Sequence, residues 1–208
     1  MNEATVIAES LVNSGALKFG KFILKSGIES PYYIDLAWLL SSPIDFEHVS
    51  KVIADRIREI ALRRAVEKLA TIELKGALIL PHVAGILKMP CVIVRKEAKT
   101  YGLTGRIVGG EVRRGERFIF FDDVLTDGKS KIEGIRPIEE EGGVIDTILV
   151  VVDREQGGRE NLEALGYNVE SITTISEVVN RLLVIGKINS EEAEKMMAYV
   201  RSRGKIQR

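Results

Sequence analysis

The sequence predicts an α/β fold in which a parallel sheet is flanked by helices. Short, almost fully apolar segments, such as residues 118–121 and 144–152, alternate with longer segments whose apolar residues recur at helical spacing. Continuous apolar runs are typical of strands buried on both faces, because helices cover both sides of a parallel sheet. The chain has 208 residues, of which 45% are hydrophobic, so one domain can bury a core of its own.

The N-terminal part predicts a helix, two short strands and a longer helix. The first helix is expected over residues 6–17 and ends near Gly15, and the strands are expected over residues 19–24 and 32–36. The longer helix has the clearest pattern in the chain. Its apolar residues recur at helical spacing from Phe46 to Ala61, and the preceding Asp45 is expected to cap its start.

From residue 69 onward, strands and helices alternate. The expected strands cover residues 69–72, 91–95, 118–121, 144–152 and 169–175. The expected helices cover residues 77–87, with Pro81 near the start, and residues 129–141, 160–165, 178–183 and 191–200. In such sheets ligands bind beyond the carboxyl ends of the strands, so functional residues are expected in the loops that lead from strands into helices.

The composition disfavours several classes of function. Thirty basic residues balance thirty acidic ones, so the net charge gives no reason to expect nucleic acid or an anionic membrane as a partner. Cys91 is the only cysteine, which excludes an intramolecular disulfide, and its apolar neighbours indicate a buried, inert thiol. Neither a secretory signal nor a segment of membrane-spanning length is apparent, so a cytoplasmic protein is expected.

The segment after the apolar run 118–121 carries the strongest functional signal. Two adjacent carboxylates, Asp122 and Asp123 (the acidic pair), are followed closely by a polar turn, Thr126 to Ser130 (the phosphate turn), which opens the next helix. The phosphate turn offers main-chain N–H groups, two hydroxyls, a glycine and a lysine, which together suit a terminal phosphate. The acidic pair suits sugar hydroxyls, or a metal ion that the sugar also binds.

Other interpretations of this segment explain less of it. Thr126 and Asp127 could simply cap the helix, which would be an adequate account of two adjacent aspartates alone but not of the whole pattern. A P-loop is excluded, because Asp123 stands five positions before Gly128, where that motif needs glycine. A dinucleotide-binding fingerprint is excluded as well, because no Gly-x-Gly-x-x-Gly follows a strand.

The segment from Asp122 to Ser130 resembles the phosphoribosyl-diphosphate signature of type I phosphoribosyltransferases. Four more segments narrow the resemblance to the orotate phosphoribosyltransferase family: FILKSG at 22–27, SPYYID at 30–35, RKEAK at 95–99 and VDREQGG at 152–158. All five occur in the family's order and at its spacing, and the similarity extends from about residue 10 to about residue 180.

The resemblance implies a type I phosphoribosyltransferase-like domain over residues 1–208. Its expected parts are an N-terminal hood (residues 1–40), a mobile lid hairpin (residues 96–112) and a C-terminal helix (residues 184–208). The implied reaction, a step of de novo pyrimidine (UMP) biosynthesis, converts orotate and phosphoribosyl diphosphate to orotidine 5′-monophosphate and pyrophosphate. Mg²⁺ is implied as the cofactor, held mainly by the substrate, with Asp122 or Asp123 as a direct or water-mediated ligand. A homodimer with shared active sites is implied as well.

The family's pattern also assigns roles to individual residues. Phosphoribosyl diphosphate is expected on Lys25, Leu74, Lys75, Arg95, Lys96, Lys99, Tyr101, Asp122, Asp123, Val124, Leu125, Thr126, Asp127, Gly128, Lys129 and Ser130. Orotate is expected on Lys25, Tyr33, Ile34, Thr126 and Arg154, and the catalytic residues are expected to be Lys99, Lys75 and Asp123. Residues 73–76 match the pyrophosphate loop, in which this fold often has a non-proline cis peptide bond.

The chemistry of these residue types agrees with the implied roles. Cleavage of an anomeric C–O bond passes through an oxocarbenium-like state, and pyrophosphate leaves with growing negative charge. Positioning and charge neutralisation can therefore provide most of the catalysis, without a protein nucleophile. Arg154 suits an acceptor carboxylate, because its guanidinium can pair bidentately. His48 and His82 lie in predicted helices outside the motifs and are not expected to take part.

The stretch from Lys96 to Arg106 combines cations with glycines and lacks apolar periodicity. By composition it predicts a solvated hairpin, and with the resemblance it predicts a mobile lid that carries cations over the diphosphate. Many relatives have histidine where Tyr101 stands. Because a phenol has a pKa of about 10, Tyr101 is expected to donate a hydrogen bond or to pack. Small residues are common at the position of Lys129, which either adds charge to the phosphate site or points to water.

Two other functions stay open on the sequence. A phosphoribosyltransferase for another base, such as a purine, is disfavoured by Arg154 and Lys25, since purines carry no carboxylate to pair. A non-catalytic nucleotide sensor on the same fold could lose the cations of the lid and of the pyrophosphate loop, whereas this chain has Lys75, Lys96 and Lys99. Fold alone does not distinguish these functions.

Overall fold

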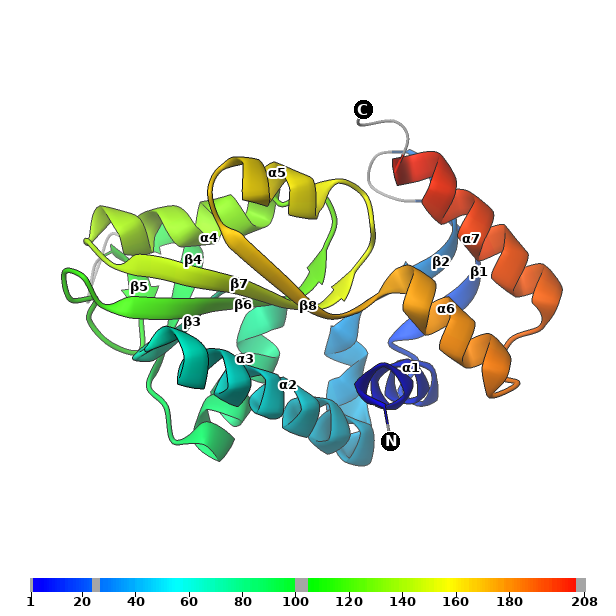
Figure 1. Cartoon of the computed structure of the whole chain (residues 1–208), viewed down its shortest axis with the longest axis horizontal. Helices are drawn as coiled ribbons and strands as arrows, with labels where there is room; N and C mark the ends of the chain where they lie inside the picture. Colours follow the sequence, from blue (N-terminus) through cyan, green and yellow to red (C-terminus); the bar gives the residue numbers. More distant parts are fainter. Residues whose placement is uncertain (1, 24–26, 100–104, 205–208) are drawn as a thin grey trace.

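The computed structural model describes residues 2–23, 27–99 and 105–204. Within these ranges the chain forms a six-stranded sheet with helices on both faces and a separate two-stranded sheet (Figure 1). The order of the large sheet is β5-β4-β3-β6-β7-β8, and its strands are parallel except for the edge strand β5, which is antiparallel to β4. The predicted class, a mainly parallel sheet flanked by helices, is confirmed, and the antiparallel edge makes the sheet mixed.

The elements have the following bounds. The large sheet comprises β3 (Lys68–Ile72), β4 (Cys91–Lys99), β5 (Gly105–Val108), β6 (Arg117–Leu125), β7 (Val144–Asp153) and β8 (Asn168–Thr174). The small sheet pairs β1 (Leu17–Ile23) with β2 (Glu29–Ile34). The helices are α1 (Glu3–Asn13), the 3₁₀ helix η1 (Leu36–Ser41), α2 (Pro43–Arg64), α3 (Lys75–Leu87), α4 (Lys129–Glu140), α5 (Gly158–Ala164), α6 (Ile175–Val184) and α7 (Ser190–Gly204).

Two hydrophobic cores lie on the two faces of the large sheet. The helices α4 and α5 cover one face, and α2 and α3 cover the other (Figure 1). Because successive side chains of a strand point to opposite faces, β6 contributes to both cores. Phe118 and Phe120 pack with residues of α4 and α5, whereas Ile119 and Phe121 pack on the opposite face. All four side chains are fully buried, so β6 is firmly held where it leads into the acidic pair.

The hood and the C-terminal helix pack together although they lie at opposite ends of the chain. The helix α1 contacts α2 and α6, and α7 contacts β2 (Figure 1). Tyr32 of β2 is fully buried and meets Tyr199 of α7 edge-on, with ring centroids 5.8 Å apart. Such an arrangement is favoured by the quadrupoles of the two rings. Among the described residues, no helix combines the length and apolar character that a bilayer crossing needs.

Several helix borders differ from the predicted ones. The first helix ends at Asn13 instead of residue 17, because Gly15 turns the chain with a φ of +74° and residue 17 already belongs to β1. The helix α2 begins earlier, at Pro43, where a fixed φ suits the first helical position. Asp45, expected as its cap, instead accepts a hydrogen bond from Ser42 Oγ at 2.5 Å. Pro81 lies further from the start of α3 than predicted, because the helix begins at Lys75 and not at residue 77.

Two strands extend beyond the predicted carboxyl ends. The strand β4 continues from residue 95 to residue 99, and β6 continues from residue 121 to residue 125. The extension of β6 pairs with β7 in regular register, with Asp122 opposite Val150 and Val124 opposite Val152. The acidic pair therefore belongs to a central strand and not to a loop. A hydrophobic pattern misses this extension, because the residues that continue the strand are charged.

Candidate active site

Three of the predicted motifs meet beyond the carboxyl ends of the central parallel strands of the large sheet. The pyrophosphate loop follows β3, the acidic pair lies near the end of β6 with the phosphate turn after it, and the segment 153–158 begins at the last residue of β7. Hydrogen bonds join the last two motifs. Arg154 N donates to Leu125 O at 2.9 Å, and Asn161 Nδ2 donates to Asp127 O at 3.0 Å. The carboxyl edge of the sheet thus holds residues that the sequence places far apart, as the parallel topology requires.

Asp122 is engaged by the protein itself. It lies on the α4 side of β6, where its Oδ2 is 2.7 Å from Lys131 Nζ and both side chains are almost fully buried. Its Oδ1 accepts a hydrogen bond from Asp123 N at 2.9 Å. The position of Gly76 adds a steric constraint, because a Cβ atom there would lie 3.0 Å from Asp122 Oδ1. Asp122 is therefore a packed, paired carboxylate.

Asp123 points to the opposite face and is less completely paired. Its Oδ1 accepts a hydrogen bond from Val124 N at 2.8 Å, and the residue is 6% exposed. Burial and the neighbouring charge of Asp122 raise the pKa of Asp123 to about 7, although Lys131 and Lys75 act in the opposite direction. A carboxyl group of this kind is typical of functional sites, where burial and charge are arranged for a ligand.

Lys75 stands at the start of α3, beside the acidic pair. Its Nζ lies 3.0 Å from Asp35 Oδ1, and the lysine side chain is 40% exposed. Burial alone would lower the pKa of Lys75, but the hydrogen bond to Asp35 and the charge of Asp123 outweigh it and raise the pKa. Lys75 therefore stays a cation, half exposed and directed to the region between the hood and the sheet.

The pyrophosphate loop leads directly into α3. The peptide bond between Glu73 and Leu74 is cis, as the resemblance implied, and the Leu74 side chain is 63% exposed. Glu73 Oε1 accepts a hydrogen bond from Lys96 N at 2.6 Å, which ties this loop to β4. Near the start of β5, Arg106 Nε donates to Arg95 O at 2.8 Å and links β5 to β4.

The phosphate turn is fixed by packing against α5. Gly128 has a φ of +86°, which favours glycine, and a Cβ atom there would lie 3.0 Å from Leu162 Cγ. Asp127 Oδ1 accepts a hydrogen bond from Lys129 N at 3.1 Å, but the N-cap residue of α4 is Gly128 and neither Thr126 nor Asp127. The Lys129 side chain is 86% exposed and lies near Asp127, with Nζ 3.5 Å from Oδ2. Of its two expected orientations, Lys129 has the one that faces water.

Arg154, which follows β7, contacts Tyr32 of β2. Arg154 Nε donates a hydrogen bond to the Tyr32 hydroxyl at 3.2 Å, and its guanidinium carbon lies 5.0 Å from the centre of the Tyr32 ring. Burial raises the pKa of Tyr32 even though Arg154 lowers it, so the phenol stays protonated. Beside it, Tyr33 is 39% exposed, whereas Ile34 is buried.

A second layer of polar contacts holds Arg154 in place. Asp153 Oδ1 accepts a hydrogen bond from Glu155 N at 2.8 Å, and Arg159 Nε donates to Asp153 Oδ2 at 3.3 Å. Burial raises the pKa of Asp153, against the lowering effects of the Glu155 N–H and Arg159. Glu155 has a φ of +56° and accepts a hydrogen bond from Ser176 N at 2.9 Å. The loop after β7 is thus fastened to the start of α6.

Some predicted site residues are only partly described or play a restricted part. Lys25 and Tyr101 lie outside the described residues, and of Lys99 the structure describes the main chain, paired with Gly105. The Leu125 side chain is fully buried in the core, which leaves only its main chain for a ligand. The two histidines are exposed, on α2 and α3.

Three residues of the site were not predicted: Lys131, Asp35 and Tyr32. A signal for Lys131 was present in the sequence, because it shares a helical face with the apolar Ile135 and Ile138. A lysine at such a position needs a buried partner. For Asp35 and Tyr32 the pairing with Lys75 and Arg154 is long-range, and no local pattern indicates it.

A carboxylate pair that leads into an anion-binding turn, at the carboxyl edge of a mainly parallel sheet, defines the class of the type I phosphoribosyltransferases. No family model matches the chain. An orotate phosphoribosyltransferase of Pyrococcus abyssi is 35% identical over 172 residues, which cover 83% of this chain and 93% of that protein. Another, of Methanocella arvoryzae, is 38% identical and covers 84% of this chain and 97% of that protein.

The likeness extends to solved structures. The crystal structure of orotate phosphoribosyltransferase from Aeropyrum pernix superimposes with a TM-score of 0.74 at 27% identity, over 88% of this chain and 99% of that one. Together with the sequence identities, this shows that the chain belongs to the orotate phosphoribosyltransferase family. The predicted family and the predicted fold are confirmed.

Proposed function

We propose that this protein transfers the ribose 5-phosphate of phosphoribosyl diphosphate to orotate, giving orotidine 5′-monophosphate and pyrophosphate in the synthesis of UMP. Membership of the family supports the reaction. The observation that carries the proposal is the hydrogen bond from Arg154 N to Leu125 O, at 2.9 Å. It joins a wall suited to a carboxylated acceptor to the turn suited to a sugar phosphate, so both substrates would meet at one edge of the sheet.

The donor substrate is proposed to lie along the ends of β3 and β6. The main-chain N–H groups of the phosphate turn would bind its 5′-phosphate, as at other helix N-termini. Asp123 would accept hydrogen bonds from the ribose hydroxyls, for which its partly unpaired carboxylate is suited. Lys75 would neutralise the leaving pyrophosphate, together with Arg95, Lys96 and Lys99 from the lid. The proposed catalytic residues are Lys99, Lys75 and Asp123.

Orotate is proposed to bind between Arg154 and the hood. Arg154 would pair with its carboxylate, because the Tyr32 hydroxyl holds only one of its donors. Tyr33 and Ile34 would lie beside the ring, with Thr126 and Lys25 as further polar partners. Charge neutralisation and positioning would then provide most of the rate acceleration, with no covalent enzyme intermediate.

The donor set of the site fits a metal ion that the substrate largely holds. Among the described residues, no group of three or more His, Cys, Asp or Glu could hold a metal ion. Asp123 could add one carboxylate oxygen, directly or through water, whereas Asp122 is already paired with Lys131. Mg²⁺ bound with the diphosphate would spread its negative charge, which suits a hard cation with mainly oxygen and water ligands.

Residues 1–40 and 96–112 are proposed to act as hood and lid of a single domain, and the chain is proposed to form a cytoplasmic homodimer. Exposed apolar side chains on η1 and the start of α2 support the dimer, since large exposed apolar patches mark interaction sites. Trp38, Leu40 and Ile44 are 48%, 51% and 70% exposed. They are close in sequence to Tyr33 and Asp35 of the site, so an interface there would also border the substrates.

The reaction is tested by the absorbance of orotate. We expect it to change only when phosphoribosyl diphosphate and Mg²⁺ are both present. The same assay with adenine, guanine or hypoxanthine in place of orotate tests a purine acceptor, whose acceptance would refute the assignment of Arg154. Binding of phosphoribosyl diphosphate without turnover of any base would instead indicate a nucleotide sensor.

Sharing of sites across the dimer is tested by mixing two inactive variants. One carries a lid substitution, Lys99→Ala, and the other carries Asp123→Asn. If the lid lysine acts on the neighbouring subunit, half of a random mixture consists of heterodimers with one intact site, and about a quarter of the wild-type activity returns. If it acts within its own subunit, heterodimers gain no intact site and the mixture stays inactive.

A further inference from the structure

The buried Lys131 is the most unusual charged residue outside the proposed ligand contacts. Its side chain is 4% exposed, and its ammonium has three acceptors within reach: Asp122 Oδ2 at 2.7 Å, Val124 O at 2.5 Å and Ser130 Oγ at 3.3 Å. An ammonium group donates three hydrogen bonds. All its donors are therefore used by protein groups, and Lys131 has none left for a ligand.

The three acceptors belong to the two parts of the site that would contact phosphoribosyl diphosphate. Asp122 and Val124 lie in the last part of β6, and Ser130 ends the phosphate turn. Lys131 thus connects the end of the strand to the start of α4, on the side of the strand away from Lys75. A cation at this point fixes the acidic pair and the phosphate turn relative to each other.

The pairing makes the two carboxylates unequal. Both oxygens of Asp122 have protein partners, Lys131 Nζ and Asp123 N. For Asp123, only Oδ1 has a partner among the described residues, and Oδ2 is left for a ligand. A carboxylate that an internal ammonium already neutralises has little to gain from a sugar hydroxyl or a metal ion.

We propose that Lys131 is a positioning residue of the donor site: it holds Asp122 as an internal counterion, so that Asp123 alone presents a carboxylate oxygen to phosphoribosyl diphosphate. This inference rests on the proposed function. Lys131 acts through Asp122 and the main chain and touches no substrate. The role of Asp122 is then to balance Lys131, and the pair can be replaced only as a unit.

The experiment compares four variants, Lys131→Met, Asp122→Asn, Asp122→Asn/Lys131→Met and Asp123→Asn, with the wild type. The dissociation constant of phosphoribosyl diphosphate is measured by calorimetry, with and without Mg²⁺ and without orotate, on protein shown to be folded by circular dichroism. Removal of one member of a buried ion pair leaves an unpaired charge, whereas removal of both does not. We expect Lys131→Met to weaken binding roughly 10- to 100-fold, since it displaces the acidic pair. The double variant is expected to bind more tightly than either single variant, and the loss that remains would reflect the missing contacts of Lys131 with Val124 O and Ser130 Oγ.

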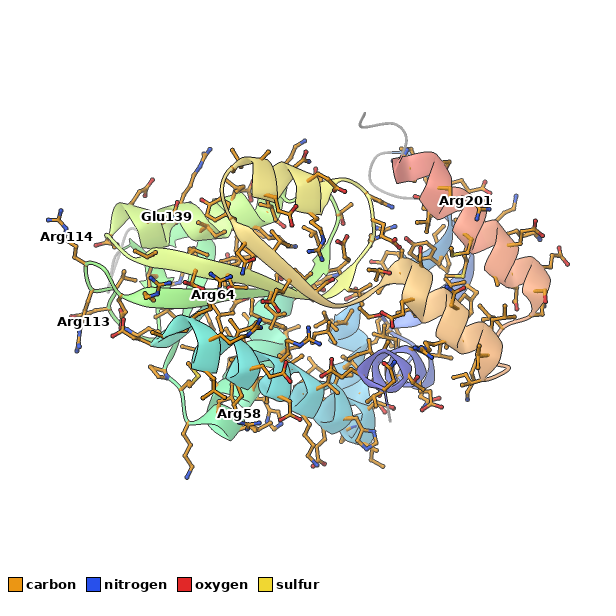
Figure 2. The ribbon with its side chains drawn as sticks, in the orientation of Figure 1. Arg58, Arg64, Arg113, Arg114, Glu139 and Arg201 are labelled. Atoms are coloured by element: carbon orange, nitrogen blue, oxygen red, sulfur yellow. The ribbon has the colours of Figure 1, made fainter. Side chains whose placement is uncertain are left out.

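A matched control is available at the other end of the sheet. Lys68 begins β3 and is likewise paired in a largely buried setting, with Nζ 2.8 Å from Glu116 Oε1. Arg113 and Arg114 mark this end of the molecule in Figure 2, and Arg201 of α7 marks the opposite end. Lys68→Met is expected to lower the free energy of unfolding without changing the dissociation constant, which separates positioning from a general loss of stability.

The possible results distinguish an error in the role proposed for Lys131 from an error in the proposed function. Unchanged binding by folded Lys131→Met would overturn the proposal, and so would a double variant that binds as weakly as Asp122→Asn, because Asp122 would then contact the ligand itself. Should Lys131→Met not fold, the double variant decides alone. Retained binding by Asp123→Asn would also overturn the proposal. A wild type that does not bind phosphoribosyl diphosphate would instead refute the proposed function, and the role of Lys131 with it.

Discussion

The substitution Asp123→Asn is expected to stabilise the unliganded protein above neutral pH while abolishing binding of phosphoribosyl diphosphate. Burial and the charge of Asp122 raise the pKa of Asp123 from 3.8 to about 7. At about 1.4 kcal/mol per unit, a shift of about three units amounts to roughly 4 kcal/mol. Because the residue is only 6% exposed, solvent screens little of this energy. Asparagine has nearly the same shape and can still accept the hydrogen bond from Val124 N.

The direction of the pH dependence follows from proton binding in the two states. In the unfolded chain Asp123 loses its proton near pH 3.8, whereas in the folded protein it keeps the proton up to about pH 7. Between these values the folded state binds more protons, so its stability falls as the pH rises, and it becomes constant above the folded pKa. The asparagine variant lacks this loss. The free energy of unfolding of the variant, relative to that of the wild type, should therefore rise by roughly 2–3 kcal/mol between about pH 5 and about pH 8.

Urea denaturation of both proteins at several pH values measures this difference. All other titrating groups are common to the two proteins and cancel to a first approximation. The reasoning would be refuted if the difference between the free energies of unfolding of the two proteins changed by less than about 0.5 kcal/mol between about pH 5 and about pH 8. Asp123 would then be ionised in the unliganded fold at neutral pH, and the cost of its burial would be far smaller than the geometry indicates.

Three more substitutions test the walls and the lid of the site. Tyr32→Phe removes the hydroxyl that accepts from Arg154 Nε at 3.2 Å; steady-state kinetics should show a KM for orotate raised several-fold, about 1 kcal/mol, with the KM for phosphoribosyl diphosphate unchanged. Gly158→Ala would place a methyl group 2.5 Å from Thr126 O, and denaturant unfolding should show a loss of about 1–3 kcal/mol. Lys99→Ala should lower kcat far more than it weakens orotate binding, since its charge is needed as the bond breaks; equal losses in both would contradict a lid role.

The sequence indicated the five parallel strands of the large sheet because most of their buried residues are apolar. Where burial involves charge, the pattern fails. The last residues of β6 pair regularly with β7, yet the acidic pair was expected in a loop because carboxylates are rarely buried. Lys131 explains the exception, since its ammonium neutralises Asp122 inside the protein. The segment around Asp122 does not reveal that this carboxylate is buried, because its partner Lys131 lies in α4.

The segments proposed to bind the substrates could be predicted from local sequence, but the contacts that support these segments could not. The phosphate turn is a continuous segment, and the anion binding proposed for it depends on its own main chain and on glycine. Arg154 was found in the same way. Its partner Tyr32 belongs to the hood, and the side chain that packs on Tyr32 comes from the last helix. Pairings between the two ends of a chain leave no periodic trace, so only the fold shows them.

The edge contact between Tyr199 and Tyr32 has a practical consequence. Cleaving the chain within residues 186–189 would detach α7 and remove Tyr199 from its contact with Tyr32, the partner of Arg154. The phosphate turn would keep its packing, because Gly128 lies against Leu162 of α5. In the proposed function, loss of α7 would therefore disturb the binding of the acceptor and leave the binding of the 5′-phosphate intact.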